Sequence, residues 1–428
     1  MSEQPASTAK LVRAVGFWGL VAMCINAVVG SGVFLLPSES YKLVGPFSLW
    51  IPLLAAVPVF ILVLCFAEAA SHFTEPGGAF LYARTAFGDF IGFETGWMNW
   101  LARVSSLAAL SNGFVVTLAR HFPTLGSGAQ RAAVIVISIV ILAAIHLVGV
   151  RYGAASIYVF TAGKLIPLCL FIVVALVAWK HNPFPGSTHV SESMSLGQAW
   201  LFVLFAYAGF ENLGVPAGEF KNPRRDLPMA LLGGIVAIGA LYSLTQLGAM
   251  SALLDLSKTD TPIADAAGAL LPIGAAIISI GALLSMAGTN SGTMLEGSRM
   301  LYALSLGRPR LRPVSYVHPR FHTPTVAIVI HALVALALAL GGSFAKLALL
   351  SAIARLTTYL FTALAVPRLR KLNEGFRTPS YVVPVLGTII ALASFFCLNA
   401  FQFVAAGIGI AAGALVYLSA GKSLAEVD

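Results

Sequence analysis

Apolar residues fill long segments of the chain, and short polar stretches separate these segments. A helix needs roughly 20 apolar residues to cross the hydrocarbon core of a bilayer. The most uniform segments are 49–67, 134–150, 165–179, 229–254 and 326–340. A run without Asp, Glu, Lys or Arg, residues 378–421, is long enough for two spans, and we expect a break near 399–402. The pattern therefore predicts an all-α integral membrane protein.

Less uniform segments complete a set of about twelve predicted transmembrane helices. Their approximate centres are Val28, Val59, Leu107, Ile141, Leu170, Phe205, Tyr242, Ser285, Leu333, Leu356, Ile389 and Ile410. The loops between these centres are short, so we expect no soluble domain.

The composition excludes several classes of protein. Of the 428 residues, 58% are hydrophobic and only 10% are charged. A soluble domain carries about 25% charged residues, because its surface must be hydrated. We therefore exclude an ordinary cytosolic enzyme, a nucleic-acid-binding protein and a disordered protein. The four cysteines lie in apolar runs without metal-ligand spacing, so no disulfide, metal or other cofactor is expected.

The positions of Lys and Arg orient the helices, because cytoplasmic loops of membrane proteins carry an excess of both. With the N-terminus in the cytoplasm, 17 of the 26 Lys and Arg residues fall inside and 6 fall outside. This bias favours an even number of spans in the plasma (inner) membrane, with cytoplasmic tails at 1–13 and 422–428. Residues 1–10 lack the apolar core of a signal peptide, so the first helix is expected to stay in the membrane.

Small residues interrupt the first predicted helix at Val29-Gly30-Ser31-Gly32. A second interruption, Phe205 to Glu211 with a glycine at 209, lies in the sixth helix. Interrupted helices at matching positions of two halves indicate an inverted-repeat transporter with a binding site between them. Helix N-termini attract the carboxylate of a small zwitterion, and freed carbonyls accept from its ammonium group. The alternative for the first interruption is close helix packing through small residues.

Several motifs are similar to those of one transporter superfamily. Two of them are Gly30-Ser31-Gly32-Val33-Phe34 and the segment 205–228, which ends in Lys221-Asn222-Pro223-Arg224-Arg225-Asp226-Leu227-Pro228, a highly specific loop signature. Supporting motifs are Glu75 to Gly78, Ser298 to Tyr302 and His318 to Pro324. In this order, and over nearly its full length, the chain resembles the amino acid–polyamine–organocation superfamily of permeases.

This resemblance implies a LeuT-type fold that carries amino acids by alternating access. Helices 1 to 5 would form a first inverted repeat in 14–180, helices 6 to 10 a second in 195–372, and two further helices would follow in 378–421. The implied substrate site takes four residues from helix 1 and three from helix 6: Val29, Gly30, Ser31, Gly32, Phe205, Ala206 and Gly209. The helix 1 residues would bind the α-carboxylate and α-amine, and Phe205 resembles an aromatic lid.

Lys164 in the fifth helix is an ionisable residue at membrane depth, where such residues are rare because their burial is costly. A lysine at this place in the superfamily resembles a replacement for bound sodium, with its ammonium group touching helices 1 and 8. The resemblance implies sodium-independent transport. Because burial disfavours the charged form of a lysine, proton exchange at Lys164 is a further expected role. The alternative is a lysine whose ammonium group reaches the membrane surface.

Three more charged residues are predicted within the membrane: Arg103 in helix 3, Glu211 in helix 6 and Arg355 in helix 10. Because buried charges need partners, we expect Glu211 to pair with the arginines around the broken helix. The alternatives are a proton-sensitive gate at Glu211 and contact between an arginine and an anionic substrate. Asn290 and Thr293 of helix 8 are weaker candidates for the cavity.

The sequence thus predicts a secondary transporter without catalytic activity. It would carry neutral L-amino acids by sodium-independent proton symport or by exchange, while cationic amino acids, polyamines and anionic amino acids stay open as substrates. An ion channel is the alternative from another class, but its pore would need repeated rings of polar residues. Besides the amino acid and a proton, the expected partner is the lipid bilayer and not nucleic acid. Monomer and homodimer both stay open.

Overall fold

The computed structural model describes residues 16–73, 77–149, 154–184, 195–214, 221–371, 376–378 and 380–421, without the side chains of 154–158, 223 and 224. Helices, turns and connecting segments make up this part of the chain, and no strand occurs within it. The all-α class that we predicted is confirmed for these residues. The predicted tails at 1–13 and 422–428, the pair Glu75-Pro76 and residues 215–220 lie outside the described residues.

The first half of the chain contains eight α-helices and three short 3-10 helices in the described residues. They are α1 (Phe17–Val28), α2 (Gly32–Val44), η1 (Gly45–Leu49), α3 (Ile51–Ser71), α4 (Ala79–Phe87), α5 (Asp89–Ala119), η2 (Pro123–Gly126), α6 (Gly128–Val148), α7 (Ala154–Val177), α8 (Leu196–Tyr207) and η3 (Phe210–Asn212). The second half continues with α9 (Pro223–Ala252), η5 (Leu256–Lys258), α10 (Pro262–Leu270), α11 (Gly274–Ser305), η6 (Pro309–Leu311), α12 (Thr325–Gly341), α13 (Phe344–Leu369), α14 (Val382–Phe395) and α15 (Ala400–Ala420).

Eight of the described helices are long and apolar enough to cross a membrane, namely α3, α5, α6, α7, α9, α11, α13 and α15. The bent pair α1 and α2 can form a ninth span, and α8, α12 and α14 are shorter apolar helices. Every predicted helix centre lies within one of these helices. The predicted break near residue 399 is present, because Asn399 caps the N-terminus of α15 through a capping box with Gln402.

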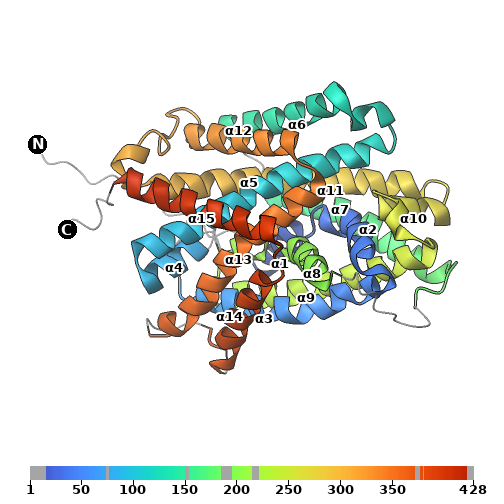
Figure 1. The fold of residues 1–428 in the computed structure, drawn as a ribbon, viewed down its shortest axis with the longest axis horizontal. Helices are drawn as coiled ribbons and strands as arrows, with labels where there is room; N and C mark the ends of the chain where they lie inside the picture. Colours follow the sequence, from blue (N-terminus) through green and yellow to red (C-terminus); the bar gives the residue numbers. More distant parts are fainter. Residues whose placement is uncertain are drawn as a thin grey trace, which may run out of the picture.

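Two short helices were not predicted. Both α4 and α10 have only 9 residues, too few to cross a bilayer. In Figure 1 they lie at opposite ends of the molecule. The sequence pattern of long apolar segments does not report such elements, because they cover the ends of the bundle.

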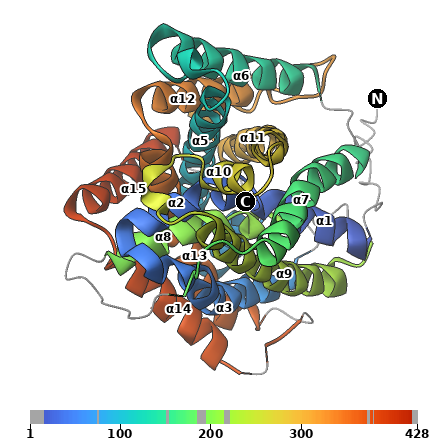
Figure 2. The same ribbon diagram turned by 90° about the vertical axis from the view of Figure 1, so that its right-hand side faces the viewer.

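The long helices α5, α11 and α13 form the central framework, with α5 packed against both of the others. A second group, α3 and α9, packs together on the opposite side of the broken helices (Figures 1 and 2). The short helices α1 and α8 lie between these groups: α1 contacts α9, and α8 contacts α3 and α13. The interrupted segments are therefore enclosed by unbroken helices, as backbone without helical hydrogen bonds must be in a membrane.

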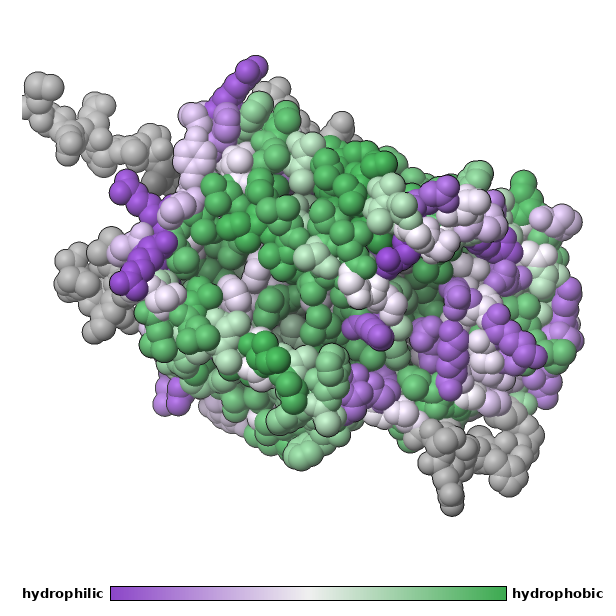
Figure 3. Space-filling model, turned by 45° about the horizontal axis from the view of Figure 1, so that its top comes forward, coloured by the Kyte–Doolittle hydropathy of each residue, from purple (hydrophilic) through white to green (hydrophobic). Residues whose placement is uncertain are grey.

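The outer surface is apolar around the middle of the molecule. Figure 3 shows a broad hydrophobic area, with hydrophilic residues gathered toward the two ends. Large apolar side chains such as Val177, Phe396 and Phe401 are more than four-fifths exposed. A soluble protein would bury such residues, whereas lipid covers them in a bilayer. The surface thus agrees with a membrane-spanning fold.

Candidate functional site

The first helix breaks where the sequence predicted. α1 ends at Val28 and α2 begins at Gly32, and the two helices meet at an angle of 42°. Ser31 is the N-cap of α2, but its side chain does not cap the helix. The Ser31 hydroxyl is buried and has no hydrogen-bond partner among the described residues. Because the first N–H groups of a helix have no partner within it, this N-terminus can receive a carboxylate.

The sixth helix also breaks at the predicted place. α8 ends at Tyr207, Ala208 is extended, and Gly209 has a φ of +131° before η3 begins. A side chain at Gly209 would collide with the carbonyl group of Ala27 at the end of α1. Both the left-handed backbone and the lack of space require glycine here.

The two breaks lie against each other. A Cβ atom on Gly32 would lie 2.8 Å from the Cα and Cβ atoms of Ala206, so α2 and α8 touch through backbone. The Tyr242 hydroxyl of α9 contacts both breaks, at 2.8 Å from the Ala206 oxygen and 3.2 Å from the Val28 oxygen. The predicted juxtaposition of the interruptions around Ser31 and Gly209 is therefore present.

A pocket with a cavity volume of about 30 Å³ opens between the breaks. It has backbone-rich walls from α1, α2 and α8, and polar side chains from α5, α11 and α13. Its lining residues are Ala27, Val28, Gly30, Ser31, Gly32, Arg103, Ser106, Leu110, Phe205, Ala206, Ala208, Thr289, Thr293 and Arg355.

Five of the seven predicted substrate residues line this pocket: Gly30, Ser31, Gly32, Phe205 and Ala206. The other two lie beside it. The Val29 carbonyl accepts hydrogen bonds from Lys164 and Ser285, and Gly209 packs on α1. Their roles in binding stay predictions.

The sequence did not indicate Ser106, Leu110 or Thr289 as pocket residues, although all three line it. Thr289 lies one helical turn before Thr293, a weaker candidate that also lines the pocket. This spacing was the only available signal for Thr289. By contrast, Asn290 lies beside Ser111 of α5, with its amide nitrogen 3.4 Å from the hydroxyl oxygen.

Lys164 makes the contacts that the resemblance implied. Its ammonium group donates to the carbonyl oxygens of Asn26 and Val29, at 3.1 and 2.6 Å, and to the Thr289 hydroxyl at 3.3 Å. Lys164 is fully buried, so it does not reach the membrane surface. It joins the break in the first helix to α11, and its role in ion coupling stays a prediction.

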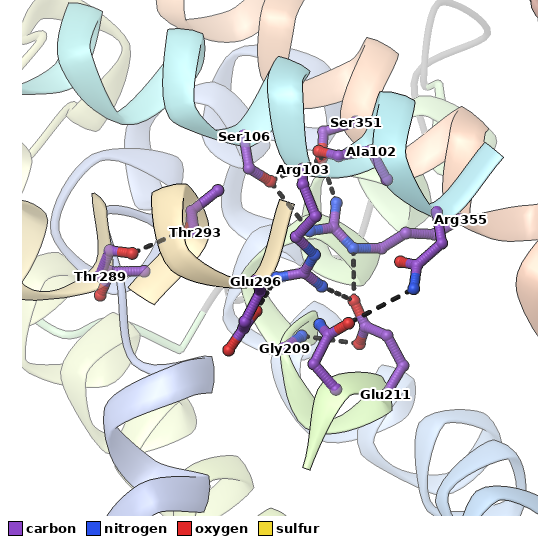
Figure 4. A network of polar contacts seen from close by, with 12 residues as sticks. Ala102, Arg103, Ser106, Gly209, Glu211, Thr289, Thr293, Glu296, Ser351 and Arg355 are labelled. Atoms are coloured by element: carbon purple, nitrogen blue, oxygen red, sulfur yellow. Dashed lines mark hydrogen bonds and ion pairs between the residues drawn. The ribbon is translucent and has the colours of Figure 1, made fainter. Parts of the chain in front are cut away.

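Glu211 lies at the centre of a buried polar network (Figure 4). Its Oε1 atom accepts from Arg103 and from Arg355, the latter at 2.8 Å. Its Oε2 atom accepts from the backbone N–H of Gly209 at 2.8 Å. The expected pairing of Glu211 with both arginines is thus present, and it fixes the backbone of the second break.

Further hydroxyl groups complete the environment of Arg355. Its Nη2 atom donates to the Ser106 hydroxyl at 2.9 Å, and its Nη1 atom donates to Ser351. The Ser106 and Ser351 oxygens are 2.8 Å apart. Because Arg103, Ser106 and Arg355 also line the pocket, this network forms its polar wall.

Glu296 of α11 is a member of the network that sequence reasoning missed. Its Oε2 atom lies 3.2 Å from Nη1 of Arg103, on the side away from Glu211 (Figure 4). The signal was a single carboxylate in an apolar helix, three residues after Thr293 and therefore on the same helical face.

A separate ion pair lies near one end of the molecule. Glu68 of α3 accepts from Arg370 at 2.5 and 2.9 Å, and it also accepts from the backbone N–H and hydroxyl of Thr378. These hydrogen bonds to Glu68 raise the pKa of the Arg370 guanidinium above its ordinary value. The pair anchors the segment after α13 to α3.

Comparison with known proteins identifies the family of the chain. The profile of the amino acid permease family matches residues 15–420. The chain belongs to this family. The permease is 29% identical over 400 residues to the serine/threonine exchanger SteT of Bacillus subtilis (strain 168), which covers 91% of each protein. It is 25% identical over 411 residues to the b(0,+)-type amino acid transporter 1 of Mus musculus, which covers 92% of the permease and 83% of the relative.

The family assignment confirms the resemblance to the amino acid–polyamine–organocation superfamily. Both relatives are named as carriers of amino acids, and the matches extend over almost the whole permease. The permease is therefore a multi-pass membrane protein of an amino acid transporter family.

Proposed function

We propose that the permease exchanges small neutral L-amino acids across the inner membrane by alternating access, without sodium. The observation that carries this proposal is the pocket between two broken helices whose interruptions touch at Gly32 and Ala206. Such a pocket offers helix ends of opposite polarity, which is what the two charges of an amino acid require.

The α-carboxylate would bind at the N-terminus of α2. The N–H groups of Gly32 and Val33 belong to the first turn of that helix, and the Ser31 hydroxyl beside them is a buried, unpartnered donor. The α-ammonium group would lie toward the C-terminal ends of α1 and α8, where the last carbonyls have no acceptor role within the helix. The predicted binding residues Val29, Phe205, Ala206 and Gly209 belong to these ends or follow them directly.

The pocket favours a short side chain. Its cavity volume of only about 30 Å³ leaves no room for a bulky side chain in this conformation. The hydroxyls of Ser106, Thr289 and Thr293 in its wall suit a substrate that itself carries a hydroxyl. Since one relative is named a serine/threonine exchanger, serine and threonine are the first candidates.

Lys164 supports sodium independence. Its ammonium group occupies the space between the Asn26 and Val29 carbonyls and the Thr289 hydroxyl, and those oxygens are the hard ligands that a small cation would need. We infer that the ammonium group of Lys164 serves there in place of a bound ion.

The same proposal includes the finer architecture. The eight long apolar helices, the bent pair and the three short apolar helices would make twelve spans, in repeats at 14–180 and 195–372 and a final pair at 378–421. The excess of Lys and Arg on one side supports cytoplasmic tails at both ends.

Counterflow into liposomes tests this function. Purified permease, reconstituted with unlabelled L-serine inside, should accumulate labelled L-serine at a saturable rate that is unchanged when potassium replaces sodium. Gly32→Ala should abolish counterflow because its Cβ would meet Ala206, whereas Gly233→Ala, where no atom lies within 4 Å, should not. A cooperative thermal unfolding transition in both variants is the control that they fold. Non-saturable ion conductance, or uptake that needs sodium, would contradict the proposal.

A further inference from the structure

The charges of the pocket wall balance only when Glu296 is counted. Arg103 and Arg355 line the pocket and each carries one positive charge. Glu211 alone compensates one of them, although it bonds to both. The second negative charge is that of Glu296, which contacts Arg103 from α11 (Figure 4).

The two carboxylates are held very differently. Glu211 is fully buried and accepts from Arg103, Arg355 and the backbone of Gly209. Among the described residues, Glu296 has one ion pair, with Arg103 at 3.2 Å, and 27% of its side chain is exposed. Glu296 is thus the member of the network that can exchange a proton with water while the others stay in place.

We propose that Glu296 sets the charge that the pocket presents to a substrate. When Glu296 is ionised, the wall is neutral and favours a neutral amino acid. When Glu296 takes a proton from water, one guanidinium charge is left uncompensated, and the pocket accepts an amino acid with an anionic side chain. No covalent bond of the substrate changes, and the anion and its proton enter the site together.

The surroundings of Glu296 support this role. The packed elements also carry Lys164 and Cys169 of α7, Arg131 and His146 of α6, His331 of α12, Asp89 and Glu94 of α5, and Arg299 and Tyr302 on α11 itself. Of these, Arg299 acts electrostatically on Glu296. His146 lies beside Ser291 and His331 accepts from Trp100, while Lys164 bonds to backbone carbonyls. α1 contributes only the thiol of Cys24, and Asp265 of α10 pairs with Arg120. Arg103 is the group that faces both the pocket and Glu296.

The test compares L-aspartate with its neutral isostere L-asparagine as inhibitors of L-serine counterflow. Glu296→Gln should raise the affinity for aspartate relative to asparagine by at least about tenfold, because a charge interaction at close range is worth more than a tenfold change in binding. In the wild type, the affinity for aspartate relative to asparagine should rise when the pH is lowered from about 7.5 to about 5.5. Free aspartate keeps its charge over this range. In Glu296→Gln the ratio should not change with pH.

Glu39→Gln is the matched control, because Glu39 pairs with Lys42 and is not among the residues that line the pocket. It should keep the aspartate to asparagine ratio and the pH response of the wild type. An unchanged ratio in Glu296→Gln would overturn the inference. If Glu296→Gln does not fold, the wild type still tests the inference. An aspartate to asparagine affinity ratio that does not change with pH in the wild type would overturn it. The inference rests on the proposed function, but the two can fail separately. Absence of L-serine counterflow in the wild type would contradict the proposed function. Normal L-serine counterflow, with an aspartate to asparagine ratio that does not change, would contradict only the role of Glu296.

Discussion

At the scale of single residues, Glu94 of α5 differs from the other buried carboxylates. It is only 5% exposed, and neither of its oxygens has a hydrogen-bond partner among the described residues. It faces Gly413 of α15, where even a Cβ atom would lie 2.6 Å from Oε2. Burial of polar atoms without partners costs free energy, so Glu94 lowers the stability of the α5–α15 contact.

We therefore expect Glu94→Met to stabilise the protein by roughly 1–3 kcal/mol, because methionine has a similar shape and no polar atom to satisfy. Thermal unfolding in detergent measures this as a higher midpoint temperature. Glu68→Met is the matched control: Glu68 is equally buried but bonds to Arg370 and Thr378, so its replacement should lower the midpoint. A drop in both variants would mean that Glu94 has partners that its geometry does not reveal.

At the scale of elements, the sequence predicted each long helix, because lipid demands continuous apolar segments. The two breaks were predictable as well, since Gly30, Gly32 and Gly209 interrupt segments that are otherwise apolar. The partners of the charged residues were not. Arg103 and Glu296 are 193 positions apart, and only the packing of α5 on α11 brings them together. The position of Val29 beside the pocket, instead of in its wall, likewise depends on how α7 and α11 approach the break.

Tyr242 provides a test of how two broken elements act together. Its hydroxyl lies between the Val28 and Ala206 carbonyls, and a hydrogen bond of this kind contributes about 0.5–1.5 kcal/mol. We expect Tyr242→Phe to weaken L-serine binding by roughly threefold to tenfold, because the walls of the pocket lose their common anchor. The concentration dependence of counterflow measures this change.

Tyr207→Phe is the control for Tyr242→Phe. The two rings lie 5.1 Å apart, but the Tyr207 hydroxyl donates to Pro52 of α3 and not to either break. This variant should lose a similar amount of stability and keep the affinity for L-serine. Equal losses of affinity in the two variants would show that general packing, and not the bridge between α1 and α8, sets binding.

At the scale of the whole molecule, ion pairs lie near both ends of the bundle. At one end, Arg120, which directly follows α5, donates to Asp265 of α10 at 2.9 and 2.7 Å. Toward the other end, Glu68 binds Arg370, and α13 packs on α4. Figure 1 places α10 and α4 at opposite ends, so we expect each pair to restrain one end of the bundle. The proposed alternating access would require these restraints to open one at a time.

Neutralising one pair should therefore open one end selectively. A second pocket has a cavity volume of about 30 Å³ and is lined by Ser40 and Gln246 among others. It shares Gly32 and Ala206 with the pocket between the breaks and is lined in part by α2, which packs on α10. With the exposed Cys169 and the half-buried Cys397 replaced by serine, Ser40→Cys reports access from the α10 end to a membrane-impermeant thiol reagent. Asp265→Asn should speed its labelling several-fold, because α10 loses its hold on α5, while Glu68→Gln should not. Equal labelling in the two backgrounds would show that Arg120 and Asp265 do not restrain the opening, and that the contacts of α10 with α2 and α11 suffice to close this end.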